Sequence, residues 1–154
     1  MRRLPLPAFP TLAMAAALVA VVGVPGAPAP REAPARPAGG SCSVLRVVDG
    51  DTVEMACPAA GRFRARLTGY DTPESFAPRC PAEARAARRA TERLRGLVAA
   101  SRSLEARLGD RDRYNRRLVR LHLDGRDVGA TLIAEGLAVP YRGGARPDWC
   151  ARLG

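Results

Sequence analysis

The sequence predicts a small α+β domain, built on a five-stranded β-barrel with two or three helices. Three observations predict it. Short runs alternate apolar and polar residues, two longer stretches have helical periodicity, and 154 residues provide one core and a short extension. The composition, 47% hydrophobic and 26% charged, excludes a disordered chain, a collagen and a multi-span membrane protein.

The chain is strongly basic. All 25 basic residues are arginine, and 15 acidic residues leave a formal net charge of +10. This excess favours anionic partners, nucleic acid first. An arginine-only basic set is also typical of codon bias in a GC-rich genome, so charge alone does not identify the partner.

The first 41 residues differ from the rest, because they hold eight of the 14 prolines and no charge from Leu4 to Pro30. Within them, Leu12 to Val24 has the length of a signal-peptide apolar region and is shorter than a membrane span of roughly 20 residues. We therefore expect a secretory signal over residues 1–27, or alternatively an uncleaved membrane anchor through residues 4–24, followed by a linker over residues 28–41. Both interpretations predict an exported domain, residues 42–154, that is periplasmic or extracellular.

The domain begins with a predicted hairpin. Val44 to Val48 and Asp51 to Met55 are strand-like runs, and Asp49-Gly50 between them suits a two-residue type I′ turn. If Val48 faces Asp51, the register places Asp51 on a mostly apolar face. A carboxylate there needs a cation or hydrogen-bond donors.

The four cysteines, Cys42, Cys57, Cys80 and Cys150, predict two disulfides rather than a zinc site. They form no C-x-x-C pair, and His122 is the single histidine. Four cysteines allow three pairings. The hairpin register opposes Cys42 to Cys57 at a separation that a disulfide tolerates, which leaves Cys80 for Cys150.

A third strand is predicted from Arg62 to Tyr70, with apolar residues alternating with arginines. It is followed by Asp71-Thr72-Pro73-Glu74, which places two carboxylates within four residues around a proline bend.

The remaining elements complete the barrel. Pro81 begins a helix whose predicted apolar stripe is Ala84, Ala87, Leu94, Leu97 and Val98. Ser103 to Leu108 and Leu118 to Leu123 are the fourth and fifth strands, joined by a charged segment. A second helix runs from Asp127 to Glu135 and ends at Gly136. The order βββαββα fits a small closed barrel, of which the OB type is the simplest.

Three motifs together carry a family resemblance. They are Val48-Asp49-Gly50-Asp51-Thr52-Val53, Arg64-Ala65-Arg66-Leu67-Thr68-Gly69-Tyr70-Asp71-Thr72-Pro73-Glu74, and Asp112-Arg113-Tyr114-Asn115-Arg116. In their order and spacing, residues 42–150 resemble the staphylococcal nuclease, or thermonuclease, family. The resemblance implies an OB-fold barrel and calcium-dependent cleavage of phosphodiester bonds in DNA and RNA.

The resemblance also implies roles for individual residues. It implies the calcium ligands Asp51, Asp71 and, through its carbonyl, Thr72; the catalytic residues Arg66, Glu74 and Arg116; and the nucleotide-binding residues Tyr114 and Tyr141. Tyr141 aligns with the family only if one residue is missing before it. Calcium prefers hard oxygen ligands, and a carboxylate such as Glu74 can orient or deprotonate the attacking water.

The segment Ser75 to Pro81 departs from the family pattern. It is shorter than the lysine-rich loop of the secreted prototype, and it carries Cys80. The prototype's C-terminal helix also has no counterpart in the sequence, so we expect the second disulfide to replace this anchoring. We therefore expect an exported, monomeric nuclease of low sequence specificity, with no protein partner implied. The alternative is a catalytically silent OB-fold module that binds nucleic acid without cutting it.

Overall fold

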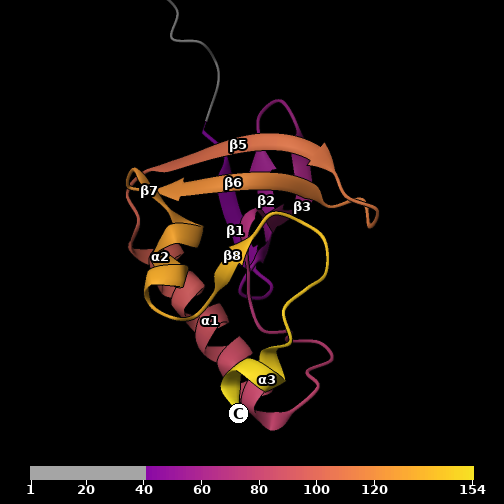
Figure 1. Cartoon of the computed structure of the whole chain (residues 1–154). Helices are drawn as coiled ribbons and strands as arrows, with labels where there is room; N and C mark the ends of the chain where they lie inside the picture. Colours follow the sequence, from indigo (N-terminus) through magenta and orange to yellow (C-terminus); the bar gives the residue numbers. More distant parts are fainter. Residues whose placement is uncertain (1–40) are drawn as a thin grey trace, which may run out of the picture. The chain divides into compact units, whose positions relative to one another are not determined.

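The computed structural model describes residues 41–154, and Figure 1 shows the arrangement of its elements. The strands are β1 Ser43–Val47, β2 Thr52–Cys57, β3 Gly61–Leu67, β4 Gly69–Asp71, β5 Leu104–Arg111, β6 Arg117–Leu123, β7 Arg126–Asp127 and β8 Val139–Tyr141; the helices are α1 Pro81–Ala100, α2 Val128–Ala134 and α3 Trp149–Leu153. The expected signal or anchor, and the expected linker up to residue 40, lie outside the described residues and stay predictions. Within residues 41–154, none of the helices combines the length and apolar character that a bilayer crossing requires.

The main sheet has the strand order β1-β2-β3-β6-β5, with the short β7 beside β6. Strands β3 and β6 are parallel, and the other neighbours are antiparallel. Over the described residues no ladder joins β5 to β1, so the prediction of a closed barrel is wrong, and the barrel is partly open, as is typical of the OB fold. The α+β class and the OB-type barrel are confirmed. Figure 1 also shows that α2 and α3 lie against the long helix α1.

Alternating residues of β3 fix which face carries charge. Phe63, Ala65 and Leu67 are buried, as predicted, whereas the arginines between them lie on the other face. Leu94 of α1 and Leu132 of α2 are fully buried in the same core. Each large aliphatic side chain stabilises the fold by about 1.5–3 kcal/mol when buried. A shift of the β3 register by one residue would expose these apolar side chains and turn the arginines toward the core. The observed register therefore keeps the arginines outside the core.

The loop between β1 and β2 is not the type I′ turn that the sequence predicts. That turn needs a positive φ at both central residues, and neither Asp49 nor Gly50 has one. Gly50 is required for a different reason. A Cβ atom at this position would lie 2.8 Å from the Thr72 hydroxyl and 3.0 Å from the Ala90 methyl group. The glycine therefore permits three segments to approach one another closely.

The predicted register of the β1–β2 hairpin is confirmed at the end far from the loop and is wrong near the loop. Ser43 pairs with Ala56 as predicted, but a β-bulge between Val44 and Arg46 shifts the remaining pairs by one residue. The last pair is therefore Val47 with Val53 rather than Val48 with Asp51.

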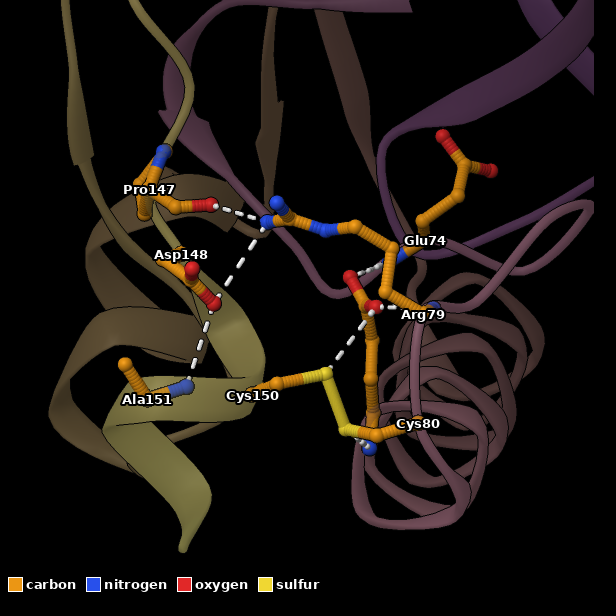
Figure 2. The surroundings of a disulfide bond; sticks show 8 residues. Glu74, Arg79, Cys80, Pro147, Asp148, Cys150 and Ala151 are labelled. Carbon is orange, nitrogen blue, oxygen red and sulfur yellow. Dashed lines mark hydrogen bonds and ion pairs between the residues drawn. A yellow bond between two sulfur atoms is a disulfide. The ribbon is translucent and has the colours of Figure 1, made fainter.

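Both predicted disulfides are confirmed, and the described residues contain no free cysteine. Cys42–Cys57 joins the β1–β2 ribbon, with 4.1 Å between its Cα atoms. Cys80–Cys150 joins the residue before α1 to α3 (Figure 2). Its loop spans a sequence separation of 70 residues, and closing such a loop stabilises the fold by about 4 kcal/mol in chain-entropy models.

Helix α1 begins as predicted, with Pro81 in its first turn and Cys80 as N-cap. Its buried stripe differs from the prediction, which omitted Ala86 and Ala90, whereas Ala84 is only half-buried. Glu83 of the first turn is also buried.

Two elements lie near the C-terminus, of which the second, α3, was not predicted from the sequence. Strand β8 pairs with β4, which opposes Tyr141 to Gly69. Helix α3 is short, and the side chain of its N-cap Asp148 accepts a hydrogen bond from the Ala151 amide. Its first residue, Trp149, is buried. The C-terminus thus has a short helix of its own.

Candidate active site

A cleft of about 1340 Å³ lies beside β3 and the turn between β5 and β6. The predicted site residues that line it are Asp51, Arg66, Thr72, Glu74, Tyr114, Arg116 and Tyr141. The eighth, Asp71, is fully buried and contacts the lining residue Arg66. The fold thus brings together all eight residues, which come from three separate motifs and β8.

Asp51, Thr72 and Glu74 line one wall of the cleft, and Asp71 lies buried next to Thr72; we call these four residues the acidic wall. Arg66, at the end of β3, joins its two aspartates. One guanidinium nitrogen forms an ion pair with Asp51, and the other lies 2.9 Å from Asp71 Oδ1. The side chain of Arg66 is only 14% exposed, so this fork neutralises two buried carboxylates that would otherwise destabilise the fold.

Asp51 accepts several hydrogen bonds besides its ion pair. The hydroxyl groups of Thr52 and Thr72 each donate to it at 3.1 Å, and the Thr72 amide donates at 3.4 Å. Burial raises the pKa of Asp51, and the Arg66 guanidinium opposes that rise. Asp49 accepts a hydrogen bond from the Asp51 amide at 3.0 Å. The threonines and Asp49 together fix the orientation of this carboxylate.

Glu74 is held in the loop before α1. Its carboxylate accepts a hydrogen bond from the Phe76 amide at 3.0 Å, and the Glu74 amide donates to Glu83 at 3.2 Å. The Glu83 carboxylate also accepts from the Arg79 amide at 2.7 Å, and its Oε2 lies 3.7 Å from Cys150 Sγ of the second disulfide. Burial alone would raise the pKa of Glu74, but the Phe76 amide and Arg146 outweigh burial and lower it. Glu74 is therefore ionised at neutral pH.

The opposite side of the cleft is the hairpin tip, Asp112–Arg116, between β5 and β6. The Asp112 carboxylate accepts from the amides of Tyr114 and Arg116, each at 2.9 Å, and from the Arg116 guanidinium at 2.8 Å. Asn115 has a φ of 62°, a left-handed conformation that asparagine tolerates better than most residues. The Tyr114 side chain is exposed, and the guanidinium of Arg116 lies 5.5 Å from its ring centroid.

Tyr141 reaches the cleft from β8. Its hydroxyl donates to the Gly144 carbonyl at 2.6 Å, and its backbone pairs with Gly69. The tyrosine therefore connects β4 to the segment before α3.

Two residues of the site were not predicted from the sequence, Arg146 and Trp149. The Arg146 guanidinium donates to Asp71 Oδ1 at 2.9 Å, to the Thr72 carbonyl at 3.2 Å and to Glu74 at 3.0 Å. The Trp149 ring nitrogen donates to Asp71 Oδ2 at 3.0 Å. The only sequence signal was a single tryptophan next to a cysteine whose partner, Cys80, is close to Glu74 in the chain.

A comparison with models of known protein families identifies the family of this chain. A family model described as staphylococcal nuclease homologue matches residues 64–149, more than half of the sequence. The chain belongs to the staphylococcal nuclease family. No curated protein matches it. Membership in the staphylococcal nuclease family indicates a nuclease-type fold and a nucleic-acid substrate.

The oxygen atoms of the acidic wall suit the calcium ion that the staphylococcal nuclease family implies. Two carboxylates and the Thr72 carbonyl are hard donors, the kind that calcium binds. Guanidinium groups already contact these oxygen atoms, because Arg66 contacts both aspartates and Arg146 contacts Asp71 and the Thr72 carbonyl. The donor set is therefore one that attracts a cation.

A second group of potential ligand atoms, from Cys80, Glu83 and Cys150, is not a metal site. The two sulfur atoms are joined in a disulfide, so neither is available as a thiolate ligand.

Proposed function

We propose that the chain is an exported, calcium-dependent nuclease that hydrolyses phosphodiester bonds of DNA, RNA or both with little sequence specificity. The observation that carries this proposal is the meeting of Asp51, Asp71, the Thr72 carbonyl and Glu74 on one wall of an arginine-lined cleft. Such a wall combines a cation site with a proton acceptor. The family membership supplies the substrate class.

The charge of the cleft favours a polyanion. Its lining includes six arginines besides Arg146: Arg62, Arg64, Arg66, Arg111, Arg113 and Arg116. Guanidinium groups bind phosphate through two parallel hydrogen bonds and lose no charge at any physiological pH. These contacts reach the phosphate backbone rather than the base edges, which accounts for low sequence specificity.

Hydrolysis requires charge neutralisation and an activated water. Asp51, Asp71 and the Thr72 carbonyl would hold the calcium ion, which when bound supplies positive charge beside the scissile phosphate. Glu74 is the proton acceptor for the attacking water, and its lowered pKa keeps it in the required ionised form. Arg116, on the opposite side of the cleft, donates to the phosphate oxygens on which charge develops. Arg66 orients the two aspartates and adds charge beside them.

The tyrosines would hold the nucleotide next to the reacting phosphate. Tyr114 is 66% exposed at the hairpin tip, and this exposed ring would stack on a base. Tyr141 lines the cleft from β8. Stacking tolerates any base, which agrees with low specificity.

The two disulfides support export. Disulfides persist in oxidising compartments and are rare in the cytosol, so a chain with both pairs formed is suited to the periplasm or the exterior. The proposal includes both alternatives for the N-terminus, a cleaved signal over residues 1–27 or a membrane tether through residues 4–24.

A binding module without catalytic activity is the second candidate, and one observation favours it. The oxygens of the acidic wall already accept hydrogen bonds from Arg66, Arg146 and the threonines. A domain in which these contacts are permanent would bind nucleic acid through its arginines and would not cut it.

The decisive experiment is digestion of heat-denatured DNA and of RNA by the purified full-length protein, with calcium or with a chelator. We expect cleavage with calcium, and none with the chelator or in Asp51→Ala. Asp110→Ala, which removes an exposed carboxylate outside the cleft, is the matched control and should cleave normally. Salt-sensitive binding without any cleavage would establish the binding module instead.

A further inference from the structure

Arg146 contacts the same oxygen atoms that the proposed calcium site would use. Its Nε donates to Asp71 Oδ1 at 2.9 Å, and one terminal nitrogen donates to the Thr72 carbonyl at 3.2 Å. Its other terminal nitrogen donates to Glu74 Oε2 at 3.0 Å. One guanidinium thus spans two of the proposed calcium ligands and the proposed proton acceptor.

The Oδ1 atom of Asp71 has no acceptor position left for an additional cation. Its Oδ1 accepts from both Arg66 and Arg146, and its Oδ2 accepts from Trp149 at 3.0 Å. A carboxylate oxygen has about two acceptor positions, so Oδ1 is filled. Calcium binds oxygen at about 2.3–2.6 Å, which is space that a hydrogen-bonded guanidinium also needs. One of the two arginines must therefore leave Oδ1 before a metal ion binds to it.

Exposure indicates which arginine leaves. The side chain of Arg66 is 14% exposed and belongs to β3, whereas that of Arg146 is 43% exposed. Arg146 also follows Gly143 and Gly144, which have φ values of 103° and 91°, and it lies between β8 and α3. Glycines resist rotation of the backbone less than other residues do. Arg146 therefore has both a path to solvent and a segment that can move.

The ends of this segment are fixed. Tyr141 binds the Gly144 carbonyl at one end, and Cys150 is joined to Cys80 at the other. A guanidinium that leaves the acidic wall consequently stays close to it, at a high effective concentration. Such an arrangement makes displacement reversible and keeps Arg146 in competition with the metal ion.

We propose that Arg146 is an internal counter-cation that sets the calcium affinity of the acidic wall, because it occupies the ligand oxygens until a divalent cation displaces it. The proposal rests on the calcium site of the proposed function. It makes the affinity of the site a property of the segment before α3 and not of the ligand residues alone.

The test is a titration of the full-length, disulfide-bonded protein with calcium alone. Trp149 is the chain's single tryptophan and contacts Asp71, so its fluorescence reports metal binding without any cleavage, and calorimetry gives the same constant independently. Arg146→Gln should bind calcium roughly tenfold more tightly or better, the scale of one charge-assisted hydrogen bond. Arg146→Lys keeps the charge but loses the planar fork, and should lie between the wild type and Arg146→Gln.

The matched control is Arg142→Gln. It removes one positive charge from the same segment, at an exposed residue that does not line the cleft. Arg142→Gln should stay within about threefold of the wild type, because an exposed charge is screened by solvent and salt. Equal affinities for Arg146→Gln and Arg142→Gln, or weaker binding by Arg146→Gln, would overturn the proposal. If Arg146→Gln does not fold, Arg146→Lys is the deciding variant. A calcium affinity of Arg146→Lys no higher than that of the wild type would contradict the proposal.

The two proposals fail separately. Calcium binding that Arg146→Gln tightens, without cleavage by any variant, supports the role of Arg146 and contradicts the nuclease. Calcium-dependent cleavage with an affinity that Arg146→Gln leaves unchanged supports the nuclease and contradicts the role of Arg146.

Discussion

The acidic wall and the hairpin tip hold their charged groups in opposite ways. Asp71, in the wall, is fully buried and binds Arg66, Arg146 and Trp149, the last of them 78 residues away in the sequence. Asp112, at the tip, binds groups within four residues of itself and lies in a solvent-accessible turn. The wall therefore depends on the tertiary fold, whereas the tip is a local structure. Changes in the two regions should separate effects on stability from effects on substrate binding.

The largest effect is expected within the wall, for Glu74→Gln. The amide cannot accept the proton of the attacking water, so cleavage should fall by about 10²–10⁴-fold. The affinity for nucleic acid, which the arginines provide, should change little. Single-turnover cleavage and binding to labelled DNA in chelator measure the two quantities. Glu105→Gln, an exposed residue of β5 outside the cleft, is the control, and an equal loss there would contradict the assigned role.

The next largest effect is expected when the second disulfide is removed by Cys80→Ser with Cys150→Ser. Chain-entropy models put the loss of unfolding free energy at about 4 kcal/mol. Cleavage should also fall at temperatures where the protein is folded, because α3 carries Trp149 to Asp71.

Removal of the first disulfide, by Cys42→Ser with Cys57→Ser, is the matched control. Its 15-residue separation predicts a loss of about 3 kcal/mol, and its sulfur atoms lie outside the cleft. Urea unfolding and cleavage rates distinguish the two variants. An equal loss of activity in both would show that the C-terminal anchor has no particular connection to the wall.

A smaller effect on stability is expected for Arg66→Lys, and the smallest for Arg116→Lys. Lysine cannot bridge Asp51 and Asp71 at once, so Arg66→Lys should lower the unfolding free energy by about 2–4 kcal/mol. Arg116→Lys should lower it by less than about 1 kcal/mol, since its ion pair is local and partly exposed. The affinity of the Arg116→Lys variant for nucleic acid should fall nonetheless. Equal losses of stability in the two variants would contradict the distinction between wall and tip.

Sequence reasoning found the tip and the two aspartates of the wall for different reasons. The tip is a contiguous motif, so the resemblance named Tyr114 and Arg116 directly. Asp51 was conspicuous because a carboxylate stood among apolar residues. The core face of β3 and both disulfides also followed from local register, which a bulge in β1 altered only near the loop.

The missed features have in common that distant segments create them. Arg146 follows two glycines in a segment without periodicity, and nothing local shows that it reaches the acidic wall. Trp149 became part of the site only when the second disulfide and α3 placed it against Asp71. The inward carboxylate of Glu83 also has no local signal, because its contacts to the Glu74 loop depend on the tertiary fold.

Gly50 has a consequence for engineering this protein. Replacement of glycine by alanine is a common way to stabilise proteins, and the ordinary φ of Gly50 would make it a candidate. Its missing side chain, however, is the space into which the Thr72 hydroxyl extends, and that hydroxyl donates to Asp51. A stabilisation screen guided by dihedral angles alone would select this position. A methyl group added at Gly50 would push Thr72 away from Asp51. The gain in backbone rigidity would then come with damage to the proposed cation site.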